Sequence, residues 1–406
     1  MGNICEDVPK PLTLVCGKPV LEHQLEVLKK EGISQFIFVV HHMAEKITEY
    51  FGDGTRFDVE ISYFYEDEPL GTAGALFKLN LKEDFLLCNG DLIFDFCLKD
   101  MIDFHNKNKA LATLFTHPNS HPYDSTLIRT DENGKIMRIA SSKDYDKPSQ
   151  NLCNAGIQIV SPQLLSLYKI DGKANFDRDI ILPAISTQRI FSYKSAEYVH
   201  DMGTPERLKQ VEKDIELGIV KAKHRRHLQK AVFLDRDGTI NVHNGFITEP
   251  NQIELIDGTS EAIKSFHQLG YLVIIVTNQP VIARGECTVE GLREIHNQLE
   301  TLLGKEGAFV DSIYYCPHHP HKGYEGEIPE LKIQCECRKP APKMILDAKR
   351  DFNIDLSQSF MVGDSDIDVE CALNAGCKPV FLSTEKRKNI LTFKSLYEFS
   401  EYLTNE

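Results

Sequence analysis

Short apolar runs alternate with amphipathic stretches along the whole chain. The runs at 35–40, 85–88 and 231–234 have the length of single strands, and short apolar runs bounded by polar residues are typical of buried strands. The stretch 21–31, just before the first of these runs, has the spacing of an amphipathic helix. This alternation predicts an α/β protein in which mainly parallel sheets are flanked by helices.

The pattern loses its apolar face once, near Leu217 and Gly218. A basic and polar stretch, KAKHRRHLQK, then occupies residues 221–230. A chain of 406 residues is too long for one typical domain. We therefore expect two domains, at 1–218 and 231–406, joined by a basic linker at 219–230.

The composition is that of an ordinary globular protein, with 42% hydrophobic and 26% charged residues. A net charge of −14 argues against nucleic-acid partners and against an anionic membrane surface. No apolar run approaches the roughly 20 residues that a membrane span needs, and the first residues lack the features of a signal peptide. Eleven cysteines in such a chain favour a reducing cytoplasm and metal binding over disulfides.

Two aspartates follow the apolar run at 231–234. Asp235 and Asp237 are separated by one residue, so on an ending strand their side chains point to the same side. Gly238 then allows the backbone to leave the strand sharply. Two carboxylates at the carboxyl end of a central strand suit a metal ion and phosphoryl chemistry better than a core.

Two further strand ends supply matching groups. The run 272–276 ends at Thr277, whose hydroxyl can bind a phosphoryl oxygen, although a helix cap is an alternative role. The run 359–362 is followed by Asp364, Asp366 and Asp368, and acidic residues there would complete a Mg²⁺ site with Asp235. A cation between these motifs would neutralise phosphate and the attacking carboxylate together. The candidates are Arg338, Lys339 and, in reserve, Lys343.

Cysteines and histidines form a second candidate metal site. Cys316 and His318 form one pair separated by a single residue, and Cys335 and Cys337 form another. Three thiolates and one imidazole spaced in this way suit tetrahedral zinc. Buried cysteine pairs are the alternative, but the loop at 320–330 has few apolar residues to fold around and would gain stability from a metal. His319 or His321 could replace His318 as the imidazole ligand.

The order of these motifs resembles the haloacid dehalogenase superfamily of aspartyl phosphatases. The resemblance implies that Asp235 attacks phosphorus and that Asp237 is the general acid and base. It implies that the substrate and its phosphoryl group contact Thr277, Asn278, Arg284, Arg338 and Lys339. It also implies Mg²⁺ ligands at Asp235, Asp237 and Asp364, with Asp368 as a second acidic neighbour.

The strings TNQPVIARGECT (277–288), CPHH (316–319) and CECRKPAPKM (335–344) are similar to those of the D-glycero-D-manno-heptose 1,7-bisphosphate phosphatases. Histidinol-phosphate phosphatases are close kin and give the alternative substrate. One departure is Pro280-Val281, where the family commonly has Ser-Gly. Proline fixes φ and removes an N–H, so we expect a reshaped substrate loop with the chemistry retained.

A separate set of strings lies in the first domain. PKPL (9–12), EDEPLGTAGA (66–75), CNGD (88–91), NAGI (154–157) and HDMGTPE (200–206) occur in that order. They resemble the sugar-1-phosphate nucleotidyltransferases, of which the heptose-1-phosphate guanylyltransferases are the nearest group given the second domain. The resemblance implies that Asp91 and Asp201 chelate Mg²⁺. It implies nucleotide and sugar contacts at Lys10, Gly71, Gly74, Asn154, Gly156 and Lys143.

The first domain also departs from that family. Its members begin with a strand and a glycine-rich loop of the form LAGGxGTR, and residues 1–8 contain neither. We favour a truncated start over a domain that has lost catalysis, and we expect a gap in the sheet and weak or absent transferase activity in the chain as written. The leading hypothesis is a fused phosphatase and nucleotidyltransferase that makes nucleotide-activated heptose for a surface polysaccharide or another glycan. A phosphatase with a non-catalytic sugar-nucleotide-binding module is the alternative.

Overall fold

The computed structural model describes residues 8–140, 148–323 and 325–406. The chain divides into two compact units. The first consists of Met1–Thr116, Arg129–Ile139 and Asn154–His224, and the second of His117–Ile128, Ala140–Cys153 and Arg225–Glu406. The division at His224 falls inside the stretch that the sequence analysis gives as the linker. In these three described ranges, no helix is both long and apolar enough to cross a membrane.

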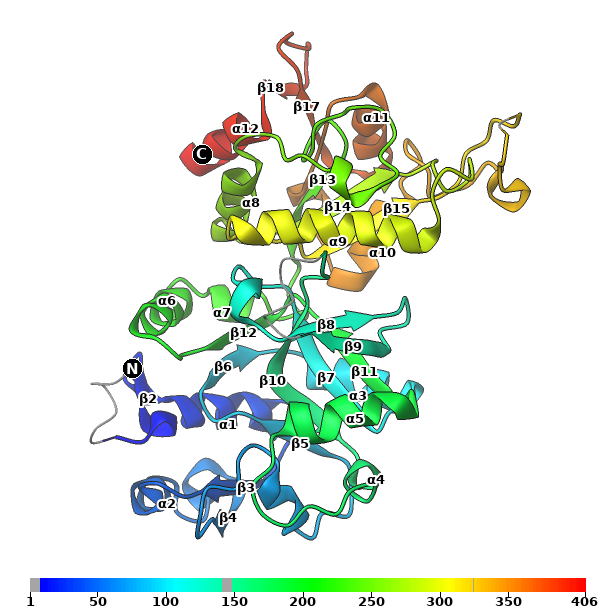
Figure 1. Ribbon diagram of the computed structural model, residues 1–406. Helices are drawn as coiled ribbons and strands as arrows, with labels where there is room; N and C mark the ends of the chain where they lie inside the picture. The colour runs from blue at the N-terminus through cyan, green and yellow to red at the C-terminus, as the bar shows by residue number, and fades with distance from the viewer. Residues whose placement is uncertain (1–7, 141–147, 324) are drawn as a thin grey trace. The chain divides into compact units, whose positions relative to one another are not determined.

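The second unit is built on one parallel sheet. Its six strands lie in the order β15-β14-β13-β16-β17-β18 (Figure 1). Their bounds are β13 Lys230–Leu234, β14 Tyr271–Asn278, β15 Ser312–Cys316, β16 Phe360–Gly363, β17 Lys378–Leu382 and β18 Leu391–Phe393. β13 lies at the centre with four fully buried residues, which is the continuous apolar pattern of a strand covered on both faces.

Helices cover both faces of this sheet. They are α8 Thr259–Gln268, α9 Val289–Lys305, α10 Lys343–Phe352, α11 Asp366–Ala375 and α12 Leu396–Asn405. On one face, α8, α9 and α12 share a core with alternate strand residues such as Val232, Leu234 and Val273. α10 packs on β14 and β15, and α11 packs on β16 and β17. Because β14 and β16 are the two neighbours of β13 and all three run in parallel, their carboxyl ends lie side by side.

The first unit has a mixed set of sheets. The largest runs β11-β7-β10-β8-β9, with β5 antiparallel to β10, while β3 pairs in parallel with β4 and β12 pairs with β6 (Figure 1). The strands are β1 Leu14–Val15, β2 Lys18–Pro19, β3 Gln35–Val40, β4 Glu60–Tyr65, β5 Phe85–Cys88, β6 Leu92–Asp95, β7 Ala112–His117, β8 Leu127–Thr130, β9 Ile136–Ala140, β10 Cys153–Val160, β11 Ile190–Lys194 and β12 Tyr198–Asp201. The main helices are α1 Val20–Lys30, α2 Ala44–Phe51, α3 Leu98–Lys107 and α6 Pro205–Glu216, with short α4 Pro162–Leu165, α5 Leu182–Ala184 and α7 Ile219–Ala222.

The α/β class predicted from the sequence is confirmed, and so are the individual elements. The predicted strands at 35–40 and 85–88 are β3 and β5, and the predicted helix at 21–31 is α1. Within the described part of the chain, β4 is the sole hydrogen-bonding partner of β3. On β3, Ile37 and Val39 are more than 40% exposed, so an apolar strand surface there faces solvent.

Candidate active site

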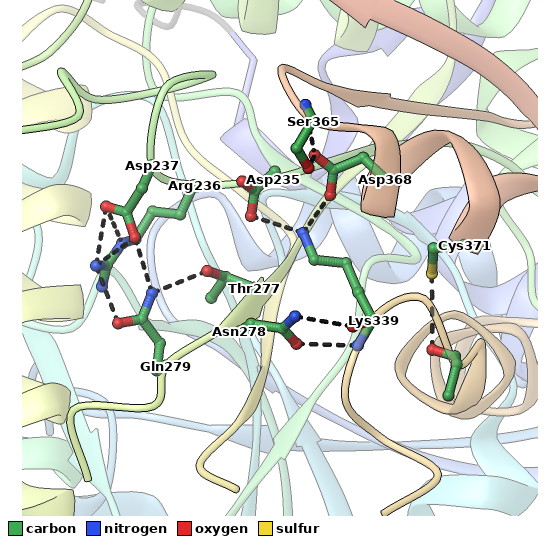
Figure 2. A network of polar contacts seen from close by, with 11 residues as sticks. Asp235, Arg236, Asp237, Thr277, Asn278, Gln279, Lys339, Ser365, Asp368 and Cys371 are labelled. Carbon is green, nitrogen blue, oxygen red and sulfur yellow. Dashed lines mark hydrogen bonds and ion pairs between the residues drawn. The ribbon is translucent and has the colours of Figure 1, made fainter. Parts of the chain in front are cut away.

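Asp235 lies at the carboxyl end of β13, beside the ends of β14 and β16 (Figure 2). Its backbone N–H donates to the Val362 carbonyl at 3.0 Å, which continues the β13–β16 pairing by one residue. Burial raises the pKa of the Asp235 carboxyl to about 6, and Lys339 opposes that rise. The side chain is thus a half-buried carboxylate at the carboxyl end of the sheet, where a ligand can bind.

Lys339 is the cation that the site contains. It is 3% exposed, and its Nζ donates to Asp235 Oδ1 and to Asp368 Oδ1, both at 2.7 Å (Figure 2). Asn278 fixes the backbone of Lys339, because its Oδ1 accepts from the Lys339 N–H at 3.0 Å and its Nδ2 donates to the Lys339 carbonyl at 3.1 Å. Lys343, the reserve candidate, begins α10 and pairs with Asp347 instead.

Three carboxylates surround this ammonium group. One oxygen each from Asp235, Asp364 and Asp368 lie within 4.8 Å of one another. Burial and the neighbouring Asp368 raise the pKa of Asp364. Three acids beside one lysine leave an excess of negative charge, and oxygen ligands of this kind are those that Mg²⁺ prefers. The donor set therefore fits a divalent cation.

Gly238 makes room for one of these acids. A Cβ at this residue would lie 2.0 Å from Asp364 Oδ2, and its φ is +83°. Only glycine combines that backbone conformation with such close approach. The glycine after Asp237 thus shapes the acidic cluster as well as the turn.

Asp237 lies outside the three-acid cluster. Its carboxylate accepts from Arg236, from Asn241 Nδ2 at 3.0 Å and from Gln279 Nε2 at 3.0 Å. Burial by itself raises the pKa of Asp237, but the Arg236 charge and these hydrogen bonds outweigh burial and hold the pKa below its usual value. Thr277 is buried on β14, and its Oγ1 accepts from Gln279 Nε2 at 2.9 Å.

Arg236 and Gln279 are functional residues that the sequence motifs did not reveal. Arg236 is the residue between Asp235 and Asp237, and Gln279 belongs to the string TNQPVIARGECT, but the burial of an arginine between two aspartates has no periodic signal. Arg236 has no exposed surface, and it ranks among the largest fully buried side chains in the described part of the chain.

The four predicted zinc ligands converge. Cys316, His318, Cys335 and Cys337 each place one ligand atom within 4.8 Å of the others. The sulfur atoms of the three cysteines lie 3.2–3.5 Å apart, and His318 Nδ1 lies 3.3 Å from the sulfur of Cys337. None of the ten described cysteines forms a disulfide. Three thiols and an imidazole at these spacings fit tetrahedral zinc.

The alternative imidazoles are arranged differently. The ring nitrogen of His319 contacts the carbonyl of His321 at 3.2 Å. Arg338, between Cys337 and Lys339, donates to the His318 carbonyl at 3.1 Å. Arg284 pairs with Glu286 at 2.8 Å and lies over the Phe246 ring.

In the first unit, the predicted metal ligands lie at neighbouring strand ends. Asp201 ends β12, and the Met202 N–H donates to the Asp91 carbonyl at 3.2 Å. Arg207 Nη1 donates to both Asp201 oxygens, at 2.7 and 3.0 Å. That guanidinium and the Gly203 N–H, opposed by burial, lower the pKa of Asp201. Asp201 is therefore ionised and partnered by a cation of the protein.

The predicted glycines of the first unit lie in close contact with other segments, Gly71 and Gly74 with backbone and Gly156 with a side chain. A Cβ on Gly71 would lie 2.4 Å from the Ala174 carbonyl, and one on Gly74 would lie 2.3 Å from the Gly172 carbonyl. A Cβ on Gly156 would meet Asn89 at 2.4 Å. These glycines allow chain segments to approach closely.

The remaining predicted residues of this unit are Asn154, Lys10 and Lys143. Asn154 Nδ2 donates to Asp177 at 3.0 Å. Lys10 is exposed in a 3₁₀ turn at Lys10–Leu12. Lys143 lies outside the described residues.

Known proteins resemble both parts of the chain. A family model described as nucleotidyl transferase matches residues 3–218, and one described as HAD-hydrolase-like matches residues 336–395. The D-glycero-beta-D-manno-heptose-1,7-bisphosphate 7-phosphatase of Yersinia pestis is 42% identical over 36% of this chain and 75% of its own length. Its counterpart in Photorhabdus laumondii is 40% identical over 40% of this chain and 88% of its own length.

Two solved structures are also similar to parts of the chain. The D,D-heptose 1,7-bisphosphate phosphatase of B. bronchiseptica, complexed with magnesium and phosphate, is 30% identical and covers 44% of this chain and 99% of its own, with a TM-score of 0.38. HddC of Yersinia pseudotuberculosis is 22% identical and covers 53% of this chain and 93% of its own, with a TM-score of 0.45.

Both resemblances drawn from the sequence motifs are confirmed by the matching families. The nucleotidyl transferase match spans more than half of the chain, and this chain covers at least three quarters of the two phosphatases compared. The chain therefore belongs to the nucleotidyl transferase family through its amino-terminal part, and to the D-glycero-beta-D-manno-heptose-1,7-bisphosphate 7-phosphatase family through its phosphatase-like part.

Proposed function

We propose that the second unit removes the 7-phosphate of D-glycero-D-manno-heptose 1,7-bisphosphate through an aspartyl-phosphate. The arrangement of Lys339 between Asp235 and Asp368 carries this proposal. A buried ammonium group beside the half-buried Asp235 carboxylate favours the charged form of the nucleophile and offsets the negative charge of an incoming phosphate.

The reaction has two steps. Asp237 first takes up a proton from solvent, because Arg236 and the hydrogen bonds keep its carboxyl ionised in the free site. Asp235 attacks phosphorus, the bond from phosphorus to the sugar oxygen breaks, and that oxygen takes the proton from Asp237. A water molecule then attacks the aspartyl-phosphate and gives a proton to Asp237, which releases inorganic phosphate and restores Asp235. Thr277 has a hydroxyl hydrogen that can donate to a phosphoryl oxygen, since its oxygen already accepts from Gln279.

Metal ions complete the site in this proposal. Mg²⁺ held by Asp235 and Asp364, with Asp368 beside them, would neutralise charge on the transferring phosphoryl group. The predicted contribution of Asp237 as a ligand would require its carboxylate to leave Arg236, because the side chain is fully engaged there. Zinc held by Cys316, His318, Cys335 and Cys337 would stabilise the loop that carries Arg338 and Lys339.

For the first unit we propose sugar-1-phosphate nucleotidyl transfer, with heptose 1-phosphate as the acceptor. Asp91 and Asp201 would hold the Mg²⁺ that bridges the phosphates. The ion pair between Arg207 and Asp201 supports the alternative, a module that binds a sugar nucleotide without catalysis, because the guanidinium occupies both oxygens of one ligand.

Phosphate release from the full chain tests the phosphatase. We expect Mg²⁺-dependent hydrolysis of heptose 1,7-bisphosphate, lost by about a thousandfold or more in Asp235→Asn because the nucleophile is removed. The exposed Asp257→Asn is the matched control and should keep wild-type activity. Faster turnover of histidinol phosphate would replace the substrate, and retained activity in Asp235→Asn would refute the mechanism. Pyrophosphate release from GTP or ATP with heptose 1-phosphate tests the first unit against nucleotide binding alone.

A further inference from the structure

We propose that Arg236 and Gln279 are positioning residues that together fix the Asp237 carboxylate for proton transfer with the sugar oxygen. The proposal rests on the proposed phosphatase function and adds two residues to it. Figure 2 shows both side chains directed at Asp237, on the side of the site away from Lys339.

The Arg236 guanidinium forms an ion pair with the Asp237 carboxylate. Its Nε donates to Asp237 Oδ1 at 3.1 Å, and its Nη2 donates to Oδ1 at 3.0 Å and to Oδ2 at 2.8 Å. The guanidinium is fully buried, and Asp237 is its ion-pair partner among the described residues. A buried arginine fork defines the plane of its carboxylate as well as its distance. Removing either partner would leave a buried charge uncompensated.

Gln279 connects this pair to the phosphate side of the site. Its Oε1 accepts from Arg236 Nη2 at 3.1 Å, and its Nε2 donates to Asp237 Oδ2 at 3.0 Å and to Thr277 Oγ1 at 2.9 Å. These contacts fix which end of the amide faces Arg236. Its backbone N–H donates to the Cys316 carbonyl at 2.8 Å. Gln279 therefore fixes the position of the Asp237 carboxylate relative to the Thr277 hydroxyl.

The position of Asp237 in the chain explains why such support matters. The residue follows the strand rather than belonging to it, in a turn where the Gly238 N–H donates to the Asn241 carbonyl at 2.8 Å. Proton transfer requires hydrogen-bond distance to the leaving oxygen, and a displacement of about 1 Å can reduce the rate on the order of a hundredfold.

Leaving-group chemistry separates this role from a purely structural one. A sugar alkoxide is a poor leaving group and needs a proton as its bond to phosphorus breaks. The leaving group of acetyl phosphate is a carboxylate, which departs without one. A misplaced Asp237 should therefore slow attack on the sugar phosphate far more than attack on acetyl phosphate.

The experiment compares full-length Gln279→Met and Arg236→Lys with the wild type, using heptose 1,7-bisphosphate and acetyl phosphate. Rapid-quench measurement of the first product, heptose 1-phosphate or acetate, reports attack on the substrate, and phosphate release reports hydrolysis of the aspartyl-phosphate. For Gln279→Met we expect a fall of about thirtyfold or more in the rate of the first step with the sugar phosphate, and a fall of less than about threefold with acetyl phosphate. KM for the sugar phosphate should stay within about threefold, because the phosphate-binding Lys339 is untouched.

Two further variants calibrate the result. Asp237→Asn should show the same preference for acetyl phosphate with a larger loss. Leu403→Ala, in the buried face of α12, destabilises the unit without touching the network and should show no preference between the substrates. If Arg236→Lys does not fold, Gln279→Met carries the test by itself.

Equal losses on the two substrates in Gln279→Met, or no loss on either, would overturn the positioning role. The proposed function is judged separately, by wild-type turnover. If the wild type prefers another alkyl phosphate, such as histidinol phosphate, the assigned sugar is wrong and the same comparison with that ester decides the role of the pair. If the wild type hydrolyses no alkyl phosphate, both the function and the positioning role are refuted.

Discussion

His296 should make the second unit sensitive to acid. This residue lies on the buried side of α9, with its ring 5.8 Å from that of Tyr315. Burial, and then the positive charge of Arg236, lower its pKa from 6.5 to about 3. Its Nε2 is buried and makes no hydrogen bond to the described residues. The folded protein therefore holds a neutral imidazole where an unfolded chain holds a protonated one at mildly acidic pH.

The sign and size of the effect follow from proton linkage. Because the folded pKa is below the unfolded one, the unfolded state binds more protons between about pH 3 and pH 6.5, and stability falls as the pH drops through that window. At about pH 5, protonation favours the unfolded chain by a factor of about 30, which is about 2 kcal/mol. At about pH 7.5 the same contribution is about 0.1 kcal/mol or less.

The change His296→Leu should remove this pH dependence. We expect the difference in unfolding free energy between about pH 7.5 and pH 5 to be about 2 kcal/mol smaller in the variant than in the wild type. Urea unfolding of the full chain, followed by far-ultraviolet circular dichroism, measures this difference. Hydrogen exchange of peptides from α9 assigns it to the second unit.

Leu299→Ala is the matched control. Leu299 is fully buried one turn further along α9, and its truncation should lower stability by about 2–5 kcal/mol at both pH values. The reasoning fails if His296→Leu keeps the wild-type pH dependence, because the imidazole would then be protonated, or solvated, in the folded state.

Three other changes probe the site. Gly238→Ala should raise the Mg²⁺ concentration for half-maximal activity by about tenfold or more, since its Cβ would displace Asp364 and its positive φ adds strain; unchanged Mg²⁺ dependence would count against Asp364 as a ligand. Lys339→Met should reduce activity by about a thousandfold and lower stability by about 3–5 kcal/mol, because buried Asp368 loses its partner, as phosphate release and urea unfolding would show. Cys337→Ser should lower zinc content and the melting temperature together, by elemental analysis and calorimetry, and an unchanged melting temperature would argue against a stabilising metal.

The strands and their carboxyl ends could be predicted from sequence because apolar runs of strand length report burial directly. The runs at 35–40 and 85–88 are strands with the predicted bounds. The placement of Asp235 and Thr277 then follows, because parallel strands end at one edge of the sheet. Chemistry that depends only on strand order is therefore visible in the sequence.

Side-chain choices that depend on packing were beyond the sequence. Lys339 and Lys343 are equally basic and four residues apart, but Lys343 starts a helix and is held by Asp347, while Lys339 is buried beside Asp235. Arg236 presents the same difficulty, since a charged residue between two aspartates is normally expected in solvent.

The acidic cluster of Asp235, Asp364 and Asp368 has a different charge environment from Asp237. Asp235 and Asp368 both pair with Lys339, and Asp364 lies beside them. Burial raises the pKa values of Asp235 and Asp364. A raised pKa means that the charged form of a carboxyl is disfavoured, so a proton and a divalent cation would compete for the same carboxylate oxygens. Asp237 lies outside this cluster, and its negative charge is neutralised by the ion pair with Arg236. The site thus divides its carboxylates into a group that favours a metal ion and one that pairs with a cation of the protein, so that attack on phosphorus and proton transfer fall to two differently placed aspartates.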